Sequence, residues 1–329
     1  MRYLITGGAG FIGSHLVDRL IADGHSVDVY DNLSTGSLDN VRRYLDHPRF
    51  ELCVGDILDF DRMRPFAERA DRIVHLAAAV GVRLIMEKPV ETITTNVGGT
   101  EVVLKLASER EIPVLIASTS EVYGKLQDTE DGLASLGEDS DWRLGPTSKR
   151  RWAYACSKAM DEFLALAYAD EKQLPVICAR FFNTVGPRQS GEYGMVIPRF
   201  VQRAMLGEPI VVYGDGDQSR CFNHVADAVE GVVRLLNEPK AYGEVFNVGN
   251  TNEITIGDLA RRVRELSHSD SEIQFVPFSE VFAHGFEDMR RRTPDLTKIH
   301  RLVGYQPKHS IDEIIMSVID YFKHNSVPI

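Results

Sequence analysis

Short apolar runs alternate with amphipathic stretches along the first half of the chain. The runs lack the two-residue alternation of a half-exposed strand, so they are typical of parallel strands that are buried on both faces. They occupy Arg2–Thr6, Ser26–Tyr30, Phe50–Val54, Arg72–Leu76, Val114–Ala117 and Val176–Arg180. Strands that alternate with helices in this way predict an α/β fold built on a doubly wound parallel sheet.

Apolar residues at helical spacing fill the segments between and after these runs. The expected helices are Ser14–Leu20, Pro89–Glu109, Trp152–Glu171, Val196–Leu206, Val225–Asn237, Thr255–Ser267 and Ile311–Lys323. After residue 180 the regular alternation loosens, although Pro209–Tyr213 is predicted as one more short strand. We therefore predict a first domain over 1–180, to which parts of the later chain return, and a smaller mixed α/β domain over 181–329.

A glycine-rich turn directly follows the first predicted strand. Gly7, Gly10 and Gly13 let the backbone turn tightly and approach a pyrophosphate, and the next helix offers its N-terminal N–H groups to the anion. The second strand leads to Asp31, 18 residues after Gly13, near the spacing of a carboxylate that binds a ribose diol. Because a carboxylate would repel a ribose phosphate, the pattern predicts a Rossmann-type site for NAD rather than NADP. A purely structural turn is the alternative.

Composition restricts the possible partners without indicating a site. The 329 residues include 37 Lys and Arg against 48 Asp and Glu, and the net charge of −11 argues against nucleic acid or an acidic membrane as partner. An anionic ligand would therefore need a local cluster of cationic side chains. The four cysteines are scattered without metal-ligand spacing, so no metal site is expected. No apolar run approaches the roughly 18 residues of a membrane span and no targeting leader is evident, so we expect a cytoplasmic protein.

A second group of chemically active residues follows the fifth predicted strand. Ser118–Gly124 lies where parallel sheets bind their ligands, and Tyr154 and Lys158 share one face of the next predicted helix. An ammonium group beside a phenol lowers the phenol's pKa from about 10 toward neutrality. The phenol could then take a proton from a sugar hydroxyl while a hydride leaves to a nicotinamide. Alone, the Tyr–Lys pair would equally suit a structural role.

Together these motifs resemble the extended short-chain dehydrogenases that act on nucleotide sugars. The resemblance covers nearly the whole chain and rests on the glycine motif, Asp31, His75-Leu76-Ala77-Ala78, Tyr154-x-x-x-Lys158 and Phe182-Asn183-x-x-Gly186-Pro187-Arg188. It implies a tightly held NAD that oxidises the sugar at C4, after which the subgroups diverge. Epimerases return the hydride to the other face, dehydratases remove water across C5 and C6, and uronate decarboxylases lose carbon dioxide.

The resemblance also implies roles for individual residues. Thr119 would bind the C4 hydroxyl, Tyr154 would be the base, and Lys158 would lower its pKa and hold the nicotinamide ribose. The cofactor-binding residues would be Gly7, Gly10, Phe11, Ile12, Gly13, Asp31, Asn32, Ser34, Thr35, Gly36, Asp56, Ile57, Leu76, Ala77, Ala78, Asn96, Tyr154 and Lys158. The substrate-binding residues would be Arg83, Ser120, Asn183, Val196, Tyr213, Arg220, Arg290 and Arg292. The arginines would supply the positive charge that a diphosphate requires, while a solvated turn is the alternative for the run at 290–292.

Two features bear on the reaction and disagree. Ser120-Glu121, with Glu121 as a further catalytic residue, and the pattern Arg290-x-Arg292-x-Pro-Asp are similar to uronate decarboxylases. The proline-containing segment of decarboxylases after His-Leu-Ala is missing, and Gly81-Val82-Arg83 is similar to uronate 4-epimerases, in which the arginine binds the sugar carboxylate. Both features indicate a uronic acid. A buried structural carboxylate is the alternative for Glu121, and a surface position is the alternative for Arg83.

We therefore expect an NAD-dependent enzyme for a UDP-sugar, with decarboxylation of UDP-glucuronate to a UDP-pentose as the leading reaction. Epimerisation at C4 is the second possibility, and 4,6-dehydration the third. A non-catalytic NAD sensor and an alcohol dehydrogenase that releases NADH are rivals. The Thr119, Tyr154 and Lys158 set argues against the sensor, and the long nucleotide-sugar half argues against the dehydrogenase. The helices Pro89–Glu109 and Tyr154–Glu171 are apolar on more than one face, and the resemblance implies that they form the four-helix bundle of a homodimer.

Overall fold

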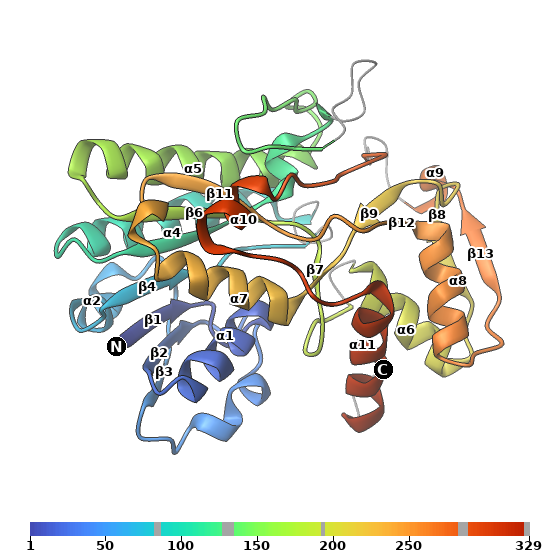
Figure 1. Ribbon diagram of the computed structural model, residues 1–329, viewed down its shortest axis with the longest axis horizontal. Coiled ribbons are helices and arrows are strands. Elements are labelled where there is room, and N and C mark those ends of the chain that lie inside the picture. Colours follow the sequence, from blue (N-terminus) through green and yellow to red (C-terminus); the bar gives the residue numbers. More distant parts are fainter. Residues whose placement is uncertain (82–86, 127–134, 192–194, 282–288, 326–329) are drawn as a thin grey trace.

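The computed structural model describes residues 1–81, 87–126, 135–191, 195–281 and 289–325. These residues form a seven-stranded sheet with helices on both faces, and a smaller region of helices and two-stranded sheets lies beside it (Figure 1). The strand order is β11-β6-β5-β4-β1-β2-β3, and all neighbours in it pair in parallel. The predicted α/β class with a doubly wound parallel sheet is therefore confirmed.

Six of the seven strands coincide with apolar runs identified in the sequence. The strands are β1 (Arg2–Thr6), β2 (Ser26–Asp31), β3 (Phe50–Val54), β4 (Arg72–His75), β5 (Val114–Thr119), β6 (Val176–Phe181) and β11 (Glu244–Val248). Leu4 and Ile5 illustrate why these runs do not alternate: both are fully buried, but in different apolar cores on opposite faces of the sheet.

Helices cover both faces of this sheet. They are α1 (Phe11–Ala22), α2 (Phe60–Glu68), α4 (Pro89–Ser108), α5 (Trp152–Lys172) and α7 (Val225–Leu236), with the shorter α10 (Thr297–Val303) beside β11. The helices α1 and α7 enclose one core, while α2, α4 and α5 enclose the other (Figure 1). Most predicted boundaries agree within two residues. The exception is α1, which begins three residues before Ser14 because Gly10, in extended conformation, is already its N-cap.

The strand β11 was not predicted, and it connects the later part of the chain to the large sheet. It lies far along the sequence, yet it pairs with β6 and completes one edge of the large sheet. Together with α7, it provides the return of the later chain that the sequence analysis allowed for.

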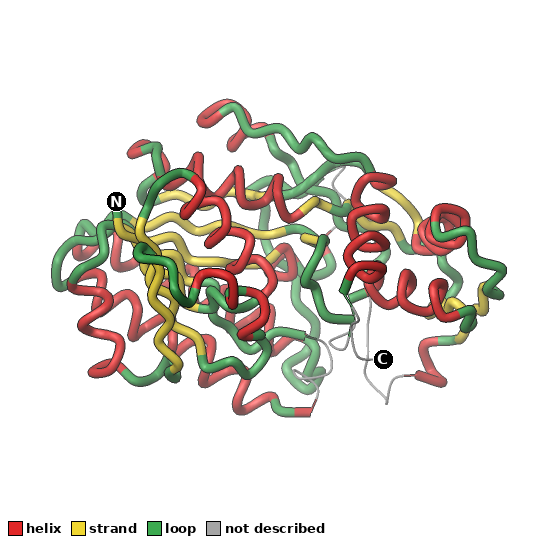
Figure 2. The backbone as a smooth tube through the Cα atoms, turned by 90° about the horizontal axis from the view of Figure 1, so that it is seen from below, coloured by secondary structure: helices red, strands yellow, loops and turns green. Residues whose placement is uncertain are grey.

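The smaller region contains three pairs of short strands and three longer helices around its own apolar core. The strand pairs are β8 (Ile210–Tyr213) with β13 (Ile273–Val276), β9 (Ser219–Cys221) with β12 (Glu253–Thr255), and β7 (Thr184–Val185) with β10 (Asn223–His224). The helices are α6 (Val196–Leu206), α8 (Ile256–Leu266) and α11 (Ile311–His324), with the short α9 (Phe278–Val281). Figure 2 shows the yellow strands of the large sheet on one side and the red helices of the smaller region on the other. In the described residues, no helix combines the length and apolar character needed to cross a membrane.

Candidate active site

The turn between β1 and α1 accepts only glycine at two positions. Gly7 has a φ of +72°, and a Cβ atom there would lie 2.7 Å from the backbone nitrogen of Ala77, at the end of β4. A Cβ atom on Gly13 would collide with the carbonyl oxygen of Gly7. Gly10 caps α1 without a side chain, so the first N–H groups of the helix face the turn. Small residues at the strand end and a helix N-terminus without a side-chain cap together form a cradle that fits a pyrophosphate.

Asp31 lies at the end of β2, next to this cradle, and neutral groups hold its carboxylate. The backbone N–H groups of Ala9 and Leu33 donate to its two oxygens at 2.9 and 2.8 Å. Burial raises the pKa of Asp31, and the two hydrogen bonds only partly oppose that effect. The carboxylate retains lone pairs for further neutral donors, which fits a ribose diol.

Two further parts of the predicted cofactor site are tied to the strand ends by hydrogen bonds. The amide of Asn96 on α4 accepts a hydrogen bond from the backbone of Ala79 at 2.8 Å and donates to Ser157 on α5 at 3.2 Å. Asn96 thereby ties the end of β4 to both helices. The loop after Asp31 is fastened to the glycine turn, because the backbone N–H of Ser37 donates to the carbonyl of Ala9 at 3.0 Å.

Tyr154 and Thr119 meet at the carboxyl end of β5, and Lys158 follows Tyr154 by one turn of α5. The phenol of Tyr154 is hydrogen-bonded to the Thr119 hydroxyl, and that hydroxyl also accepts from the backbone N–H of Glu121 at 3.2 Å. Lys158 donates from Nζ to Asp161 at 2.6 Å, and both side chains are buried. Asp161 was not identified from the sequence, although it stands one turn after Lys158.

The predicted fall in the pKa of Tyr154 is not found. Burial raises this pKa, the carboxylates of Glu121 and Asp161 raise it further, and the Thr119 hydrogen bond with the charge of Arg292 only partly opposes them. The ammonium of Lys158 is neutralised by Asp161, so it contributes little to the phenol. In the protein alone the phenol is therefore protonated at neutral pH.

Glu121 follows Thr119 and Ser120 in the short 3₁₀ helix Ser120–Tyr123, and two arginines surround it. Its Oε1 lies 3.1 Å from Nη1 of Arg292 and 3.5 Å from Nη2 of Arg151. The side chain of Glu121 is 19% exposed and those of both arginines are 7% exposed. Although burial opposes ionisation, Arg151, Arg292 and Arg220 lower the pKa of Glu121 to about 2. This carboxylate therefore stays ionised throughout the neutral range.

The predicted pair Arg290 and Arg292 has two different environments. Arg292 is buried and bonds to Glu121, whereas Arg290 is exposed and its Nη1 lies 2.7 Å from Asp215. Arg220 is buried beside this segment and donates to the carbonyl oxygen of Ser219 at 2.7 Å. Arg220 and Arg292 thus lie in the buried cluster around Glu121, and Arg290 lies outside it.

The other predicted substrate residues are distributed through the smaller region. Asn183 has a φ of +32°, and its amide donates to the carbonyl of Cys221 at 2.8 Å. The ring of Tyr213 lies 4.3 Å below the guanidinium of Arg199 on α6, and Val196 begins that helix. Arg83, which was predicted to bind the sugar carboxylate, lies outside the described residues.

A buried polar network behind the strand ends was missed by the sequence analysis. Arg180 on β6 donates to both oxygens of Glu162 on α5 and, at 2.8 Å, to the hydroxyl of Tyr123. That hydroxyl donates to Asn247 on β11, also at 2.8 Å, and Asn247 donates to the carbonyl of Leu136. The network joins β6, β11 and α5 to the 3₁₀ helix that carries Glu121.

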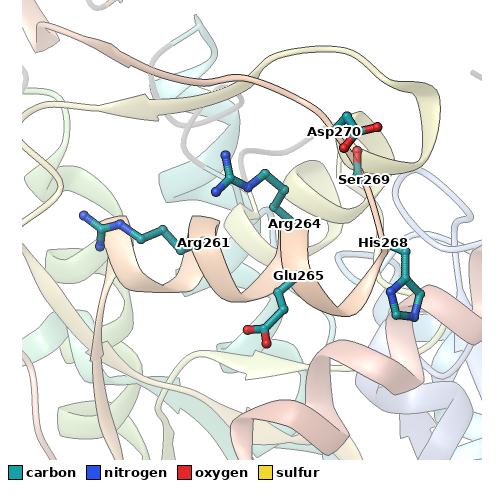
Figure 3. A pocket seen from close by; sticks show the side chains of 6 residues that line it. All are labelled: Arg261, Arg264, Glu265, His268, Ser269 and Asp270. Carbon is teal, nitrogen blue, oxygen red and sulfur yellow. The ribbon is translucent and has the colours of Figure 1, made fainter.

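Two surface cavities lie away from the strand ends. One of about 570 Å³ is bordered by the Asp215–Arg290 ion pair and by Phe275 and Phe278, beside the strand of Tyr213. The other, of about 500 Å³, lies at the end of α8, where the labelled side chains are all polar or charged (Figure 3). It shares no residue with the cluster around Tyr154 and Glu121.

Comparison with known proteins extends this description. Residues 4–318 match the protein family described as GDP-mannose 4,6 dehydratase. The chain is 42% identical, over 98% of both sequences, to a UDP-N-acetyl-alpha-D-glucosaminuronate decarboxylase of Bacillus cytotoxicus. It is 38% identical to UDP-glucuronic acid decarboxylase 1 of Danio rerio, covering 98% of this chain and 72% of that one. A crystal structure of UDP-glucuronic acid 4-epimerase from Bacillus cereus, with UDP-glucuronic acid and NAD, superposes with a TM-score of 0.86 at 27% identity, covering 98% of this chain and 99% of that chain.

Proposed function

The chain belongs to the family described as GDP-mannose 4,6 dehydratase, within the extended short-chain dehydrogenases, and we propose that it decarboxylates a UDP-linked uronate. The resemblance found from its motifs is thereby confirmed, and the protein is an NAD-dependent enzyme of nucleotide sugars. UDP-glucuronate is the expected substrate, with carbon dioxide and a UDP-pentose as the products. The two decarboxylases described above support this choice, since both remove the carboxylate of a UDP-linked uronate.

The observation that carries the proposal is the position of Glu121. Its carboxylate lies two residues beyond Thr119, which is hydrogen-bonded to Tyr154, and it is held ionised between two buried arginines. C5 is bonded to C4, so a side chain beside the residues that bind the C4 hydroxyl can act at C5. This is the carbon that a decarboxylase must protonate. A plain dehydrogenase has no need of a second ionised side chain at this place.

The residues support the following division of labour. When bound, NAD supplies a hydride acceptor for C4 and, through its cationic nicotinamide, a charge that favours the phenolate of Tyr154. Tyr154 takes the proton of the C4 hydroxyl, and Thr119 orients that hydroxyl. The C4 ketone makes the C5 carboxylate a β-keto acid, so the C5–C6 bond breaks and its electron pair enters an enolate. A proton from solvent must then reach C5, and because Glu121 stays ionised we assign it to orienting the bound water that delivers this proton, the resulting hydroxide being reprotonated from solvent. Return of the hydride to C4, with the proton held by Tyr154, would complete the UDP-pentose and restore the oxidised cofactor.

Epimerisation at C4 remains the second candidate because the B. cereus epimerase shares the fold and binds the same uronate. The sugar's C2 substituent is a further variable, since the B. cytotoxicus decarboxylase acts on an N-acetylated uronate. We therefore propose a test with UDP-glucuronate, UDP-N-acetylglucosaminuronate and UDP-glucose, with proton NMR of the products and an assay for carbon dioxide. Carbon dioxide with a UDP-pentose or its 2-acetamido counterpart is the expected outcome. Formation of UDP-galacturonate without gas would favour the epimerase, and reaction of UDP-glucose alone would exclude both uronate readings.

We further infer that the protein is a homodimer through α4 and α5. These two helices lie side by side, and their outer faces carry exposed apolar side chains. Phe163 on α5 is 60% exposed and Val90 on α4 is 75% exposed, while Met160 and Ile93 continue the same faces. Pairing with the same helices of a second copy would cover these side chains in a four-helix bundle. Light scattering at micromolar concentration should give a dimer mass, and a monomer would contradict the inference.

A further inference from the structure

Lys158 has a buried acidic partner that lies outside the motif Tyr154-x-x-x-Lys158. Its Nζ donates to Oδ2 of Asp161 at 2.6 Å, and the two side chains are 3% and 0% exposed. Asp161 stands three residues after Lys158 on α5, so the pair spans one turn of the helix that carries the base. The ammonium is therefore held by a carboxylate in a buried place.

The next residue on α5, Glu162, does not share this ammonium. Both oxygens of Glu162 accept hydrogen bonds from Arg180 on β6, the shortest at 2.7 Å, so the two adjacent acidic residues have separate cations. Burying an ion pair costs both groups their hydration, and such a pair contributes little net stability compared with apolar side chains. The Lys158–Asp161 pair is therefore better explained by what it does to the reaction than by the stability of α5.

Besides Arg180, the strands place His75 and Cys178 near this pair, and both are uncharged at neutral pH. Burial and the charge of Lys158 lower the pKa of His75 on β4 to about 3. Burial raises the pKa of the Cys178 thiol on β6. From α4, the neutral hydroxyl of Thr100 faces Asp161 and is also bonded to the ring of His75 at 3.1 Å.

The phenol of Tyr154, one turn before Lys158, responds to this pair. Burial raises its pKa, and the carboxylate of Asp161 raises it further. The other groups that act on this phenol are Glu121, Thr119 and Arg292. An ammonium without a counter-charge at Lys158 would favour the phenolate. Because Asp161 offsets that attraction, the phenol holds its proton more firmly than it would beside an unpaired lysine.

The proposed reaction uses this proton twice. In the first step C4 loses a hydride to the cofactor and its hydroxyl proton to Tyr154. After carbon dioxide has left, C4 regains the hydride and its oxygen takes the proton back from the phenol. A phenolate that is stabilised too strongly would accept the proton readily but return it poorly, since the pKa of an acid–base catalyst must suit both directions.

We propose that Asp161 is a positioning residue that offsets the charge of Lys158 and so keeps a proton on Tyr154 available for its return to C4. This inference rests on the proposed function, because only a reaction that first oxidises and then reduces C4 needs the proton back. Asp161 touches neither sugar nor cofactor in this role, and it acts through Lys158 and through its own charge.

The first test needs no turnover, because the phenolate of Tyr154 absorbs in the near ultraviolet and Tyr154→Phe in each background supplies the baseline. In the NAD-loaded protein, Asp161→Asn should lower the pH at which Tyr154 loses its proton by about one unit or more, a tenfold change or more in the equilibrium. Asp161→Glu keeps the charge and should give a value near that of the unaltered protein. The control Asp170→Asn, at an exposed carboxylate of the same helix, should leave the titration unchanged.

The second test follows the two steps at C4 with UDP-glucuronate. For Asp161→Asn, the pH below which C4 oxidation slows, seen as NADH formed in a single turnover, should fall by the same amount as in the titration. The return step should become slower, so overall turnover at neutral pH should fall by up to about tenfold while a larger fraction of the protein holds NADH. Asp170→Asn should change neither quantity.

An unchanged or raised pH for the titration of Tyr154 in Asp161→Asn would overturn the proposal, whatever the thermal stability of that variant. If Asp161→Asn does not fold, as judged by thermal unfolding, Asp161→Ser is titrated in the same way. Failure of both neutral variants to fold would make Asp161 a structural residue and would also overturn the proposal. Failure of the proposed function is distinguishable, because the unaltered protein would then release no carbon dioxide from any uronate, while the titration requires no substrate.

Discussion

Asp31 is a buried carboxylate and Glu121 a partly buried one, both near the carboxyl ends of parallel strands, yet their surroundings are opposite. Asp31, at the cofactor end, accepts hydrogen bonds from two neutral backbone N–H groups, and burial raises its pKa. Glu121, at the substrate end, lies between guanidiniums that lower its pKa to about 2. The same functional group is therefore prepared for two different ligands at two ends of one proposed site.

The difference teaches how each end selects its ligand. A carboxylate held by neutral donors gains most from further neutral donors, such as the hydroxyls of a diol, and disfavours a phosphate. A carboxylate held by guanidiniums stays ionised at neutral pH, and it lies beside groups that can also bind an anionic ligand. Removing the charge from each carboxylate should therefore affect different ligands.

The largest expected effect comes from Glu121→Gln. The amide is isosteric, but it removes one negative charge beside Arg151 and Arg292, and it removes the group assigned to protonation at C5. We expect carbon dioxide release to become undetectable while oxidation at C4 still produces enzyme-bound NADH, visible by its absorbance. NAD affinity should not change, and neither should activity in the control Asp215→Asn, which breaks only the exposed pair with Arg290. Carbon dioxide release at the original rate would show that Glu121 is structural.

The substitution Tyr154→Phe tests the step in which the cofactor end and the substrate end act together, the oxidation at C4. The ring is retained and the proton acceptor is lost, so turnover should fall by roughly 10²- to 10⁴-fold, the usual contribution of a general base. Single-turnover kinetics should locate the loss in the oxidation step, with no NADH signal. Retention of more than a tenth of the original turnover would require another base.

Asp31→Ala should act at the cofactor end alone. Loss of a charged acceptor of the ribose diol should weaken NAD by roughly ten- to a hundredfold and NADP much less. Fluorescence titration with both cofactors measures the difference. Equal affinity of the unaltered protein for NAD and NADP would contradict the role of Asp31, as would a parallel loss of UDP-glucose binding in the variant.

The smallest effect is a difference in pH dependence between the two ends. Because the pKa of Asp31 is raised, acidification from pH 7.5 should protonate it before Glu121, whose pKa is about 2. NAD affinity should therefore fall first, by up to about tenfold per pH unit below the pKa of Asp31, while UDP-glucose affinity stays nearly constant. Asp31→Asn should remove the pH dependence of NAD binding. If the affinities for NAD and for UDP-glucose fell together on acidification, the proposed difference between the two carboxylates would be contradicted.

The strands and the glycine turn of the cofactor end could be predicted from the sequence because their determinants are local, whereas the residues assigned to NAD stay predictions. A buried parallel strand needs consecutive apolar residues, and the glycine turn and Asp31 lie within one strand–helix–strand unit. The strand β11 was missed because Asn247 interrupts its apolar run. That residue is fully buried and bonded to Tyr123 and Leu136, a compensation that the local sequence does not reveal.

The substrate end was predicted as a set of residues but not as an arrangement. The partners Glu121 and Arg292 are 171 residues apart, so no periodicity links them. The strands β7 and β10 contain two residues each, too few for any pattern. The pKa of Tyr154 could not be predicted from the Lys158 spacing either, because burial and the carboxylates of Glu121 and Asp161 raise it. Arg151 was detectable in principle, since it stands one turn before the base.

The late strand β11 also bears on how the protein is made. Residues 1–180 contain every strand of the large sheet except this one, so a ribosome that has released only that part exposes β6 as an unpaired edge. Its backbone groups and apolar neighbours would then be open to pairing with other chains. We expect a fragment ending at residue 180 to aggregate, and one ending beyond α7 and β11 to remain better dispersed. The domain boundary predicted at residue 180 is thus not expected to be a place at which the polypeptide can be cut.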